Sequence, residues 1–177
     1  LVLARKAEET GSALWLDMED STTVDRTIEL YRAIRSVHRR AGLAVQAYLY
    51  RTPKDVEALI AVTPTLRLVK GAYAEPASVA FPKKADTDRA YEAIAGQMLE
   101  AAAQGRCRPI LGTHDMPLLR RIIAKARGLP AVVGAGADVL ALPDGAVAIL
   151  DGGAGRLYPH PDEFAVASAK AFQAGWK

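Results

Sequence analysis

The chain has 177 residues, a formal net charge of +3 and apolar residues at half of its positions, which is ordinary for one soluble globular domain with a sizeable core. No apolar run is long enough to cross a bilayer, and the first residues do not predict a secretory signal peptide. The single cysteine, Cys107, excludes an internal disulfide and fits a reducing compartment, so we expect a cytoplasmic protein.

The densest basic run, RSVHRR at residues 35–40, lies where a helix is expected to end. Cations are favourable there because they interact with the negative end of the helix dipole. No aromatic residues interleave with these cations to stack on bases, so we expect no nucleic-acid partner.

The first apolar run, residues 13–16, predicts a short buried strand, and a helix should follow it. Asp20, Ser21 or Thr22 is placed to cap that helix through a side-chain oxygen. The apolar stripe of the helix is expected to contain Val24, Ile28, Tyr31 and Ile34.

The second apolar run, residues 43–50, predicts another strand, and the sequence TPKD follows it closely. Thr52 is expected as the N-cap, Pro53 fits the first helical position, and Asp55 is placed like the acid of a capping box. The buried face of this helix is expected to contain Val56, Leu59 and Ile60.

The third run, residues 66–69, predicts a strand from which a long connection leads to a helix that ends near Gly105. The buried stripe of that helix is expected to contain Tyr91, Ile94, Met98 and Ala102. The fourth run, residues 110–111, is short. Asp115 should cap the last helix, which the pattern extends to Gly128.

Four strand–helix units predict an α/β fold with a parallel sheet and right-handed crossovers, either doubly wound or part of a (β/α)8 barrel. Polar residues follow every strand, and in a barrel such strand ends converge on one rim, where catalytic sites lie. We therefore expect a partial or distorted (β/α)8 TIM-type barrel over residues 1–130, because a full barrel needs roughly 250 residues. The polar residues are Asp17 and Glu19, Gln46 and Arg51, Lys70 and Tyr73, and Thr113 and His114.

Residues 131–177 form a tail that is rich in glycine and alanine and poor in charge, for which loops and edge strands are expected. Its stretch VVGAGADV resembles a dinucleotide-binding fingerprint at Gly134 and Gly136. Val139 stands where the third glycine would be, so the fingerprint fails.

Three of the polar residues indicate what the rim could bind. Asp17 is available because Asp20 and Ser21 are better placed to cap the helix. Gln46 interrupts an apolar strand. Its amide could bind the edge of a heteroaromatic ring, or it could be a core amide whose hydrogen bonds are made within the protein. His114 could be a base, a metal ligand or a ring contact, but no other histidine has a metal-ligand spacing with it. No metal site and no hydrolase triad are expected.

Arg67 and Lys70 are two cations in and after an apolar run. Their positions differ by an odd number, so in a strand their side chains point to opposite faces. An arginine inside a barrel suits a site where negative charge develops on a bound group, such as a reduced flavin. A lysine at a strand end also suits a Schiff-base nucleophile, and both alternatives stay open.

Five motifs occur in order along the chain: LDMEDS, QAYLYRT, RLVKGAYAEP, VAFPKKAD and THD. Together they resemble the FAD-dependent proline dehydrogenases over about residues 14–128. The resemblance implies a distorted (β/α)8 barrel, of which these motifs would mark strands three to six. It also implies oxidation of L-proline to pyrroline-5-carboxylate, with hydride transfer to flavin N5 and delivery of electrons to a quinone or another acceptor.

The resemblance further implies roles for particular residues. Asp17 and Arg67 would be catalytic, with Arg67 beside flavin N5, and Tyr73 would pack near the substrate ring. The implied cofactor contacts are Met18, Gln46, Arg67, Lys70, Gly71, Ala72, Thr113 and His114.

Several family features are not recognised in this sequence: the lysine of the second strand, the Gln-Met-Leu-Tyr-Gly stretch of the seventh strand, and the Tyr-x-x-Arg-Arg pattern that clamps the proline carboxylate. The stretch RLYPHPDEF does not supply the clamp. Because such a clamp provides much of the binding of a small amino acid, we expect this chain alone to oxidise proline weakly.

Two other interpretations remain open. The chain could be a non-catalytic barrel fragment or interaction module that self-associates through open sheet edges. It could also be a Schiff-base lyase that uses Lys70. For the leading interpretation, a quinone acceptor implies peripheral association with the inner face of a membrane.

Overall fold

The computed structural model describes residues 2–126, in which five helices alternate with four strands. The elements are α1 (Val2–Thr10), β1 (Leu14–Leu16), α2 (Val24–Arg35), β2 (Ala41–Gln46), α3 (Thr52–Ile60), β3 (Thr65–Val69), α4 (Lys84–Ala103), β4 (Arg108–Gly112) and α5 (Met116–Ala126). The expected end of the last helix at Gly128, the partial fingerprint and the glycine- and alanine-rich tail lie outside the described residues.

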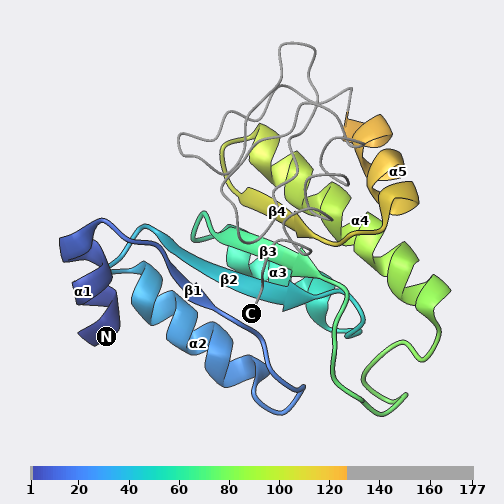
Figure 1. Cartoon of the computed structure of the whole chain (residues 1–177), viewed down its shortest axis with the longest axis horizontal. Helices are drawn as coiled ribbons and strands as arrows, with labels where there is room; N and C mark the ends of the chain where they lie inside the picture. The colour runs from blue at the N-terminus through green and yellow to red at the C-terminus, as the bar shows by residue number, and fades with distance from the viewer. Residues whose placement is uncertain (1, 127–177) are drawn as a thin grey trace, which may run out of the picture.

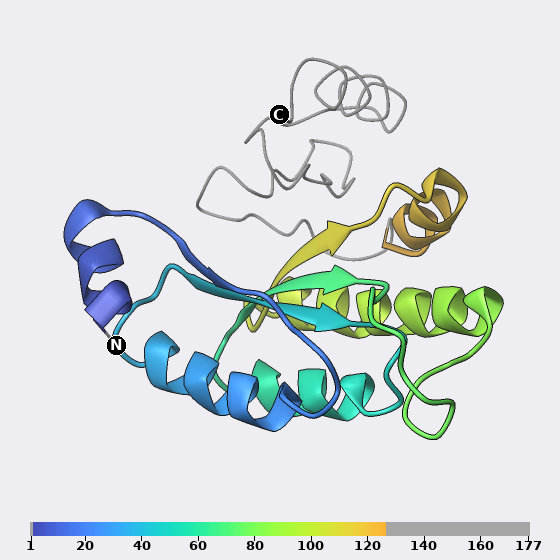
Figure 2. The same ribbon diagram turned by 60° about the horizontal axis from the view of Figure 1, so that its bottom comes forward.

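The four strands form one parallel sheet in the order β1-β2-β3-β4, which confirms the predicted α/β fold. Each strand pairs with the next one in sequence, so the order never reverses (Figure 1). A doubly wound sheet needs such a reversal, whereas an arc of a (β/α)8 barrel does not. Helices α2 and α3 lie together on one side of the sheet (Figure 2), as the helices outside a barrel do.

Strand β3 shows how the two faces of the sheet differ. Leu66 and Leu68 are fully buried, whereas Thr65, Arg67 and Val69 are only partly covered. Since alternate residues of a strand face opposite sides, the leucines pack in the core and Arg67 faces away from it. Arg67 pairs with Asp17, whereas Lys70, just after the strand, reaches Asp88 of α4, so the predicted opposite orientation of the two cations is confirmed.

The predicted helical stripes are confirmed. Val56, Leu59 and Ile60 of α3 are buried, and so are the four expected residues of α4. Ile28 of α2 is only partly buried, although it packs against the core. The four residues of α4 are Tyr91, Ile94, Met98 and Ala102.

Helix capping was predicted less well. The N-cap of α2 is Thr23, whose hydroxyl donates to the Asp20 carbonyl at 2.9 Å and makes no capping bond. The Asp20 carboxylate accepts from the backbone N–H of Thr22 at 2.9 Å in the preceding turn, so it does not cap the helix either. Asp115 does cap α5, since its carboxylate accepts from the Leu118 N–H at 3.2 Å.

The prediction for Thr52 was also wrong. Thr52 lies inside α3, and its hydroxyl donates to the Gln46 carbonyl at 2.6 Å instead of capping the helix. The same bond marks the end of β2 at Gln46, four residues earlier than expected, where the chain turns towards α3. Asp55 pairs with the Arg51 side chain at 2.7 Å and does not complete a capping box.

The long connection between β3 and α4 is pinned to the loop between β2 and α3. Tyr50 N–H donates to the Val79 carbonyl at 3.0 Å, and Phe81 N–H donates to the Tyr48 carbonyl at 2.8 Å. The rings of Tyr50 and Phe81 meet edge to face, 4.6 Å apart at their centroids. The loops that follow β2 and β3 therefore support each other at the carboxyl end of the sheet. Within residues 2–126, no helix is long and apolar enough to cross a membrane.

Candidate active site

A pocket of about 540 Å³ opens at the carboxyl end of the sheet. Segments that follow β1, β3 and β4 line it together with residues of β2. All predicted site residues lie in its lining, namely Asp17, Met18, Gln46, Arg67, Lys70, Gly71, Ala72, Tyr73, Thr113 and His114. The structure therefore brings these residues together, while their individual roles remain predictions.

Arg67 is fixed on the open face of the sheet by two neighbours. Its guanidinium forms an ion pair with the Asp17 carboxylate, and it lies over the Trp15 ring at 5.2 Å from the centroid. Its Nε is buried and has no hydrogen-bond partner among the described residues. The positive charge is thus held in a defined orientation beside the pocket, with a donor left over for a bound group.

Trp15 can lie beneath Arg67 because the neighbouring strand has a glycine there. Gly42 is the registered partner of Trp15, and a Cβ at Gly42 would lie less than 3.0 Å from the Trp15 ring carbons. The glycine therefore makes room for the aromatic ring on which the guanidinium rests. This pair could not be predicted from the sequence, because it depends on the register between two strands.

Replacing Gly42 with alanine should destabilise the fold by about 1–3 kcal/mol, because the new methyl group overpacks the Trp15 ring. Urea unfolding of the two proteins measures the difference. A Gly42→Ala protein as stable as the parent would show that the ring does not occupy this space.

Gln46 presents an unpaired acceptor to the pocket. Its Nε2 donates to the Met18 carbonyl at 3.1 Å, which fixes the side chain, while its Oε1 is buried and has no partner among residues 2–126. Leaving a buried acceptor without a donor is costly, so such atoms usually indicate a missing partner. A ligand with a ring N–H would satisfy it.

The segment after β3 approaches Tyr48 closely. Gly71 has φ +117°, and a Cβ at this residue would lie less than 3.0 Å from the Tyr48 ring. The Lys70 carbonyl accepts from the Tyr48 N–H at 2.9 Å, which fixes the preceding peptide. Only glycine suits this position, and the backbone of residues 70–72 can therefore form a wall of the pocket.

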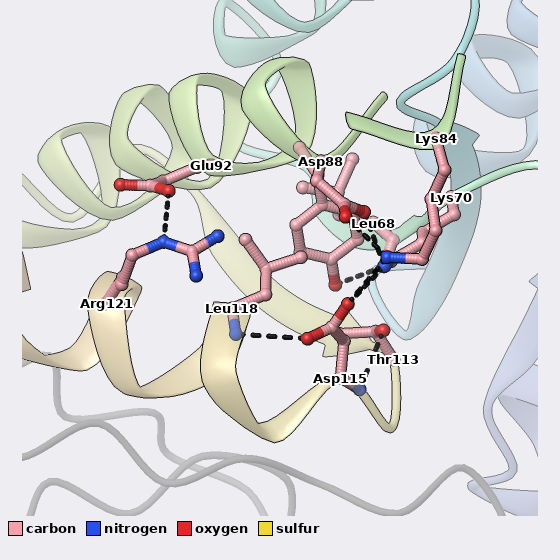
Figure 3. Close-up of polar contacts among 10 residues, drawn as sticks. Leu68, Lys70, Lys84, Asp88, Glu92, Thr113, Asp115, Leu118 and Arg121 are labelled. Carbon is pink, nitrogen blue, oxygen red and sulfur yellow. Dashed lines mark hydrogen bonds and ion pairs between the residues drawn. The ribbon is translucent and has the colours of Figure 1, made fainter. Parts of the chain in front are cut away.

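Lys70 lines the pocket, but its ammonium points to the helical side. Its Nζ lies 2.5 Å from Asp88 of α4 and 2.7 Å from Asp115 at the start of α5 (Figure 3). Hydrogen bonding from Lys70 holds the pKa of Asp115 well below its usual range. Burial opposes ionisation of Asp88, but hydrogen bonds from Lys70 and Lys84 outweigh it and lower the pKa of that carboxyl. The sequence did not indicate the participation of Asp88 and Lys84.

Two contacts near Tyr73 join the segment after β1 to the segment after β3. The Tyr73 hydroxyl donates to the Glu19 carboxylate, which raises the pKa of the tyrosine. Glu75 accepts from the backbone N–H and the hydroxyl of Ser21, at 2.6 and 2.7 Å. The chain after β1 and the chain after β3 are thereby joined at the rim.

Of the remaining polar residues after the strands, Thr113 and His114 line the pocket and Arg51 does not. Thr113 accepts from the Asp115 N–H at 3.2 Å, and His114 lies exposed in the pocket lining. Arg51 was expected at the rim, but it is absent from the pocket lining and pairs with Asp25 and Asp55. In residues 2–126, no group of three His, Cys, Asp or Glu side chains could hold a metal ion.

Comparison with known proteins identifies relatives of the chain. The family model described as proline dehydrogenase matches residues 1–133. A proline dehydrogenase of Deinococcus radiodurans is 39% identical over 135 residues, and proline dehydrogenase 2 of Bacillus subtilis is 36% identical over 129 residues. These matches cover 75% and 72% of this chain, and in both cases 41% of the relative. The chain thus spans about two fifths of the length of these relatives.

A solved structure shows the same arrangement. Proline utilization A from Bdellovibrio bacteriovorus, inactivated by N-propargylglycine, superposes with a TM-score of 0.63 and 25% identity. The match covers 72% of this chain and 15% of that protein. The parallel sheet and its helices therefore correspond to an arc of the (β/α)8 barrel of proline utilization A.

Proposed function

Because the chain belongs to the proline dehydrogenase family, we propose that its pocket is the flavin-binding part of a site that oxidises L-proline to pyrroline-5-carboxylate. The family is flavin-dependent, and FAD is the cofactor that we propose for this chain. When bound, FAD supplies the acceptor for the two electrons that leave the substrate. The observation that carries the proposal is the convergence of ten predicted site residues on one pocket.

The chemistry of the pocket residues fits a flavin. The unpaired Oε1 of Gln46 can accept from a ring N–H. The Gly71 backbone allows a flat group to approach, because no side chain projects there. Arg67 places a fixed positive charge beside the pocket, which favours the negative charge of a reduced ring.

We assign the roles of the lining residues accordingly. Arg67 stabilises negative charge, Asp17 orients the guanidinium of Arg67, and Tyr73 packs near the substrate ring. The proposed cofactor contacts are Met18, Gln46, Arg67, Lys70, Gly71, Ala72, Thr113 and His114. A quinone is the proposed electron acceptor, which would place the protein at the inner face of a membrane.

The described part of the pocket offers little to bind the carboxylate of proline. Within residues 2–126, the charge of Arg67 is paired with Asp17 and its Nε, which has no partner there, is buried, while Lys70 is paired with Asp88 and Asp115. A small amino acid depends on a charge-assisted contact of this kind for much of its affinity. The described residues therefore favour cofactor binding over substrate binding.

We predict that this chain, when supplied with FAD, reduces a dye with proline only weakly and without saturation at millimolar proline. Steady-state dye reduction over a range of proline concentrations tests the prediction. Rapid turnover with a low KM would contradict it, because it would require a carboxylate site that these residues do not provide.

The Schiff-base alternative is less favourable. A nucleophilic lysine needs its Nζ free to attack a carbonyl group, whereas the Nζ of Lys70 is engaged by two carboxylates at 2.5 and 2.7 Å on the helical side. Borohydride trapping of a carbonyl substrate on Lys70 would support the lyase.

The interaction-module alternative depends on the edges of the sheet. Within the described residues, β1 and β4 each pair with only one strand, so an edge of each is open for self-association. Light scattering that shows a monomer would count against this alternative.

A further inference from the structure

Two strand-end segments line the pocket beyond the last paired residues of β3 and β4. The register between these strands ends at Val69 and Gly112, and the next residues are Lys70 and Thr113. Some other interaction must therefore set the spacing between residues 70–72 and residues 113–114.

The side chains behind these segments supply that interaction (Figure 3). Lys70 bonds to Asp115 at 2.7 Å and to Asp88 of α4 at 2.5 Å. Lys84 bonds to the same two carboxylates, at 3.1 and 2.5 Å. Each carboxylate thus lies between two ammonium groups.

Asp115 extends the network to the end of β4. Its N–H donates to the Thr113 hydroxyl, and its carboxylate caps α5 at Leu118. A displacement of the Asp115 carboxylate would therefore move the turn that carries Thr113 and His114. The side chains of Lys70, Asp88 and Asp115 are only 18–23% exposed, so water screens these ion pairs incompletely.

We propose that Asp88 and Asp115 are positioning residues, which hold residues 70–72 and residues 113–114 at the spacing that the flavin requires. This proposal rests on the proposed function of the pocket. Neither carboxylate belongs to the pocket lining, so both act through Lys70 and Thr113.

A second acid on α4 provides a matched control. Glu92 lies one helical turn after Asp88, and its side chain is 15% exposed against 18% for Asp88. It also pairs with two cations, Arg121 at 2.9 Å and Lys125 at 2.5 Å. Its contacts join α4 to α5 but do not reach the pocket lining.

The first test compares Asp88→Asn with Glu92→Gln by hydrogen–deuterium exchange of the full chain without added flavin. Asp88→Asn should speed exchange about fivefold in peptides that cover residues 70–73 and 112–115. Glu92→Gln should leave these peptides unchanged. Equal effects of the two variants, or no effect of Asp88→Asn, would overturn the proposal, and neither result depends on whether the chain binds FAD.

The second test measures the dissociation constant of FAD by quenching of flavin fluorescence. We expect Asp88→Asn to weaken binding about tenfold, Asp88→Glu to recover part of the loss, and Glu92→Gln to bind like the parent. Faster exchange in Asp88→Asn with unchanged FAD affinity would reduce the network to a purely structural role and overturn the proposal. A parent chain that binds no FAD but shows the exchange difference would contradict the proposed function and, with it, the positioning role for a flavin.

Discussion

Replacing Gly71 with alanine is expected to destabilise the fold by about 2–6 kcal/mol, the sum of backbone strain and overpacking. Gly71 has φ +117°, which residues with a side chain rarely adopt, and the added methyl group would meet the Tyr48 ring at less than 3.0 Å. Because the same peptide forms a wall of the pocket, FAD binding should also be lost. Urea unfolding and a flavin titration measure the two effects.

Gly96→Ala is the matched control for this substitution. Gly96 lies inside α4, and an added Cβ would have no neighbouring atom within 4 Å. Alanine should therefore stabilise the helix by up to about 1 kcal/mol and leave FAD binding unchanged. If Gly71→Ala behaved like Gly96→Ala, the close approach of Tyr48 to this turn would be wrong.

Replacing Arg67 with methionine is expected to have the largest effect on the chemistry of the site. The variant removes the fixed positive charge and leaves the Asp17 carboxylate without its partner. Reduction adds negative charge to a flavin, so the midpoint potential of bound FAD should become more negative by about 30–60 mV. Spectroscopic titration with a reference dye measures this shift.

Two further variants separate charge from general destabilisation. Arg67→Lys keeps the charge but loses the planar group over Trp15, so its potential should lie between those of the parent and Arg67→Met. Arg121→Met removes an arginine that pairs with Glu92 outside the pocket lining, and it should not change the potential. A potential that is unchanged in Arg67→Met would exclude an electrostatic role for this residue.

Local patterns predicted the fold and most of the polar residues of the pocket, whereas Met18, Gly71 and Ala72 were assigned to it by the family resemblance. Alternation along a strand predicted that Arg67 and Lys70 face opposite sides, and the structure confirms it. Polar residues after successive strands predicted a common rim, because the carboxyl ends of parallel strands meet at one edge. The flavin itself came from the family resemblance and not from these patterns.

The contacts between distant residues could not be predicted in the same way. Asp88 meets Lys70 across a long connection, and Trp15 meets Gly42 only through the register of β1 and β2. Thr52 is of a residue type that often caps helices, yet it is the first residue of α3 and its hydroxyl donates to the nearby Gln46 carbonyl. The partner that each of these side chains contacts depends on how the chain packs in three dimensions, and a short sequence window does not contain that information.

The central claim is that the pocket at the carboxyl end of the sheet binds FAD, and a titration of the full chain with FAD tests it most directly. We expect saturable quenching of flavin fluorescence, with affinity reduced in Arg67→Met and Gly71→Ala and retained in Gly96→Ala. A folded chain that does not quench FAD fluorescence, or that binds FAD equally well in all four forms, would contradict the claim.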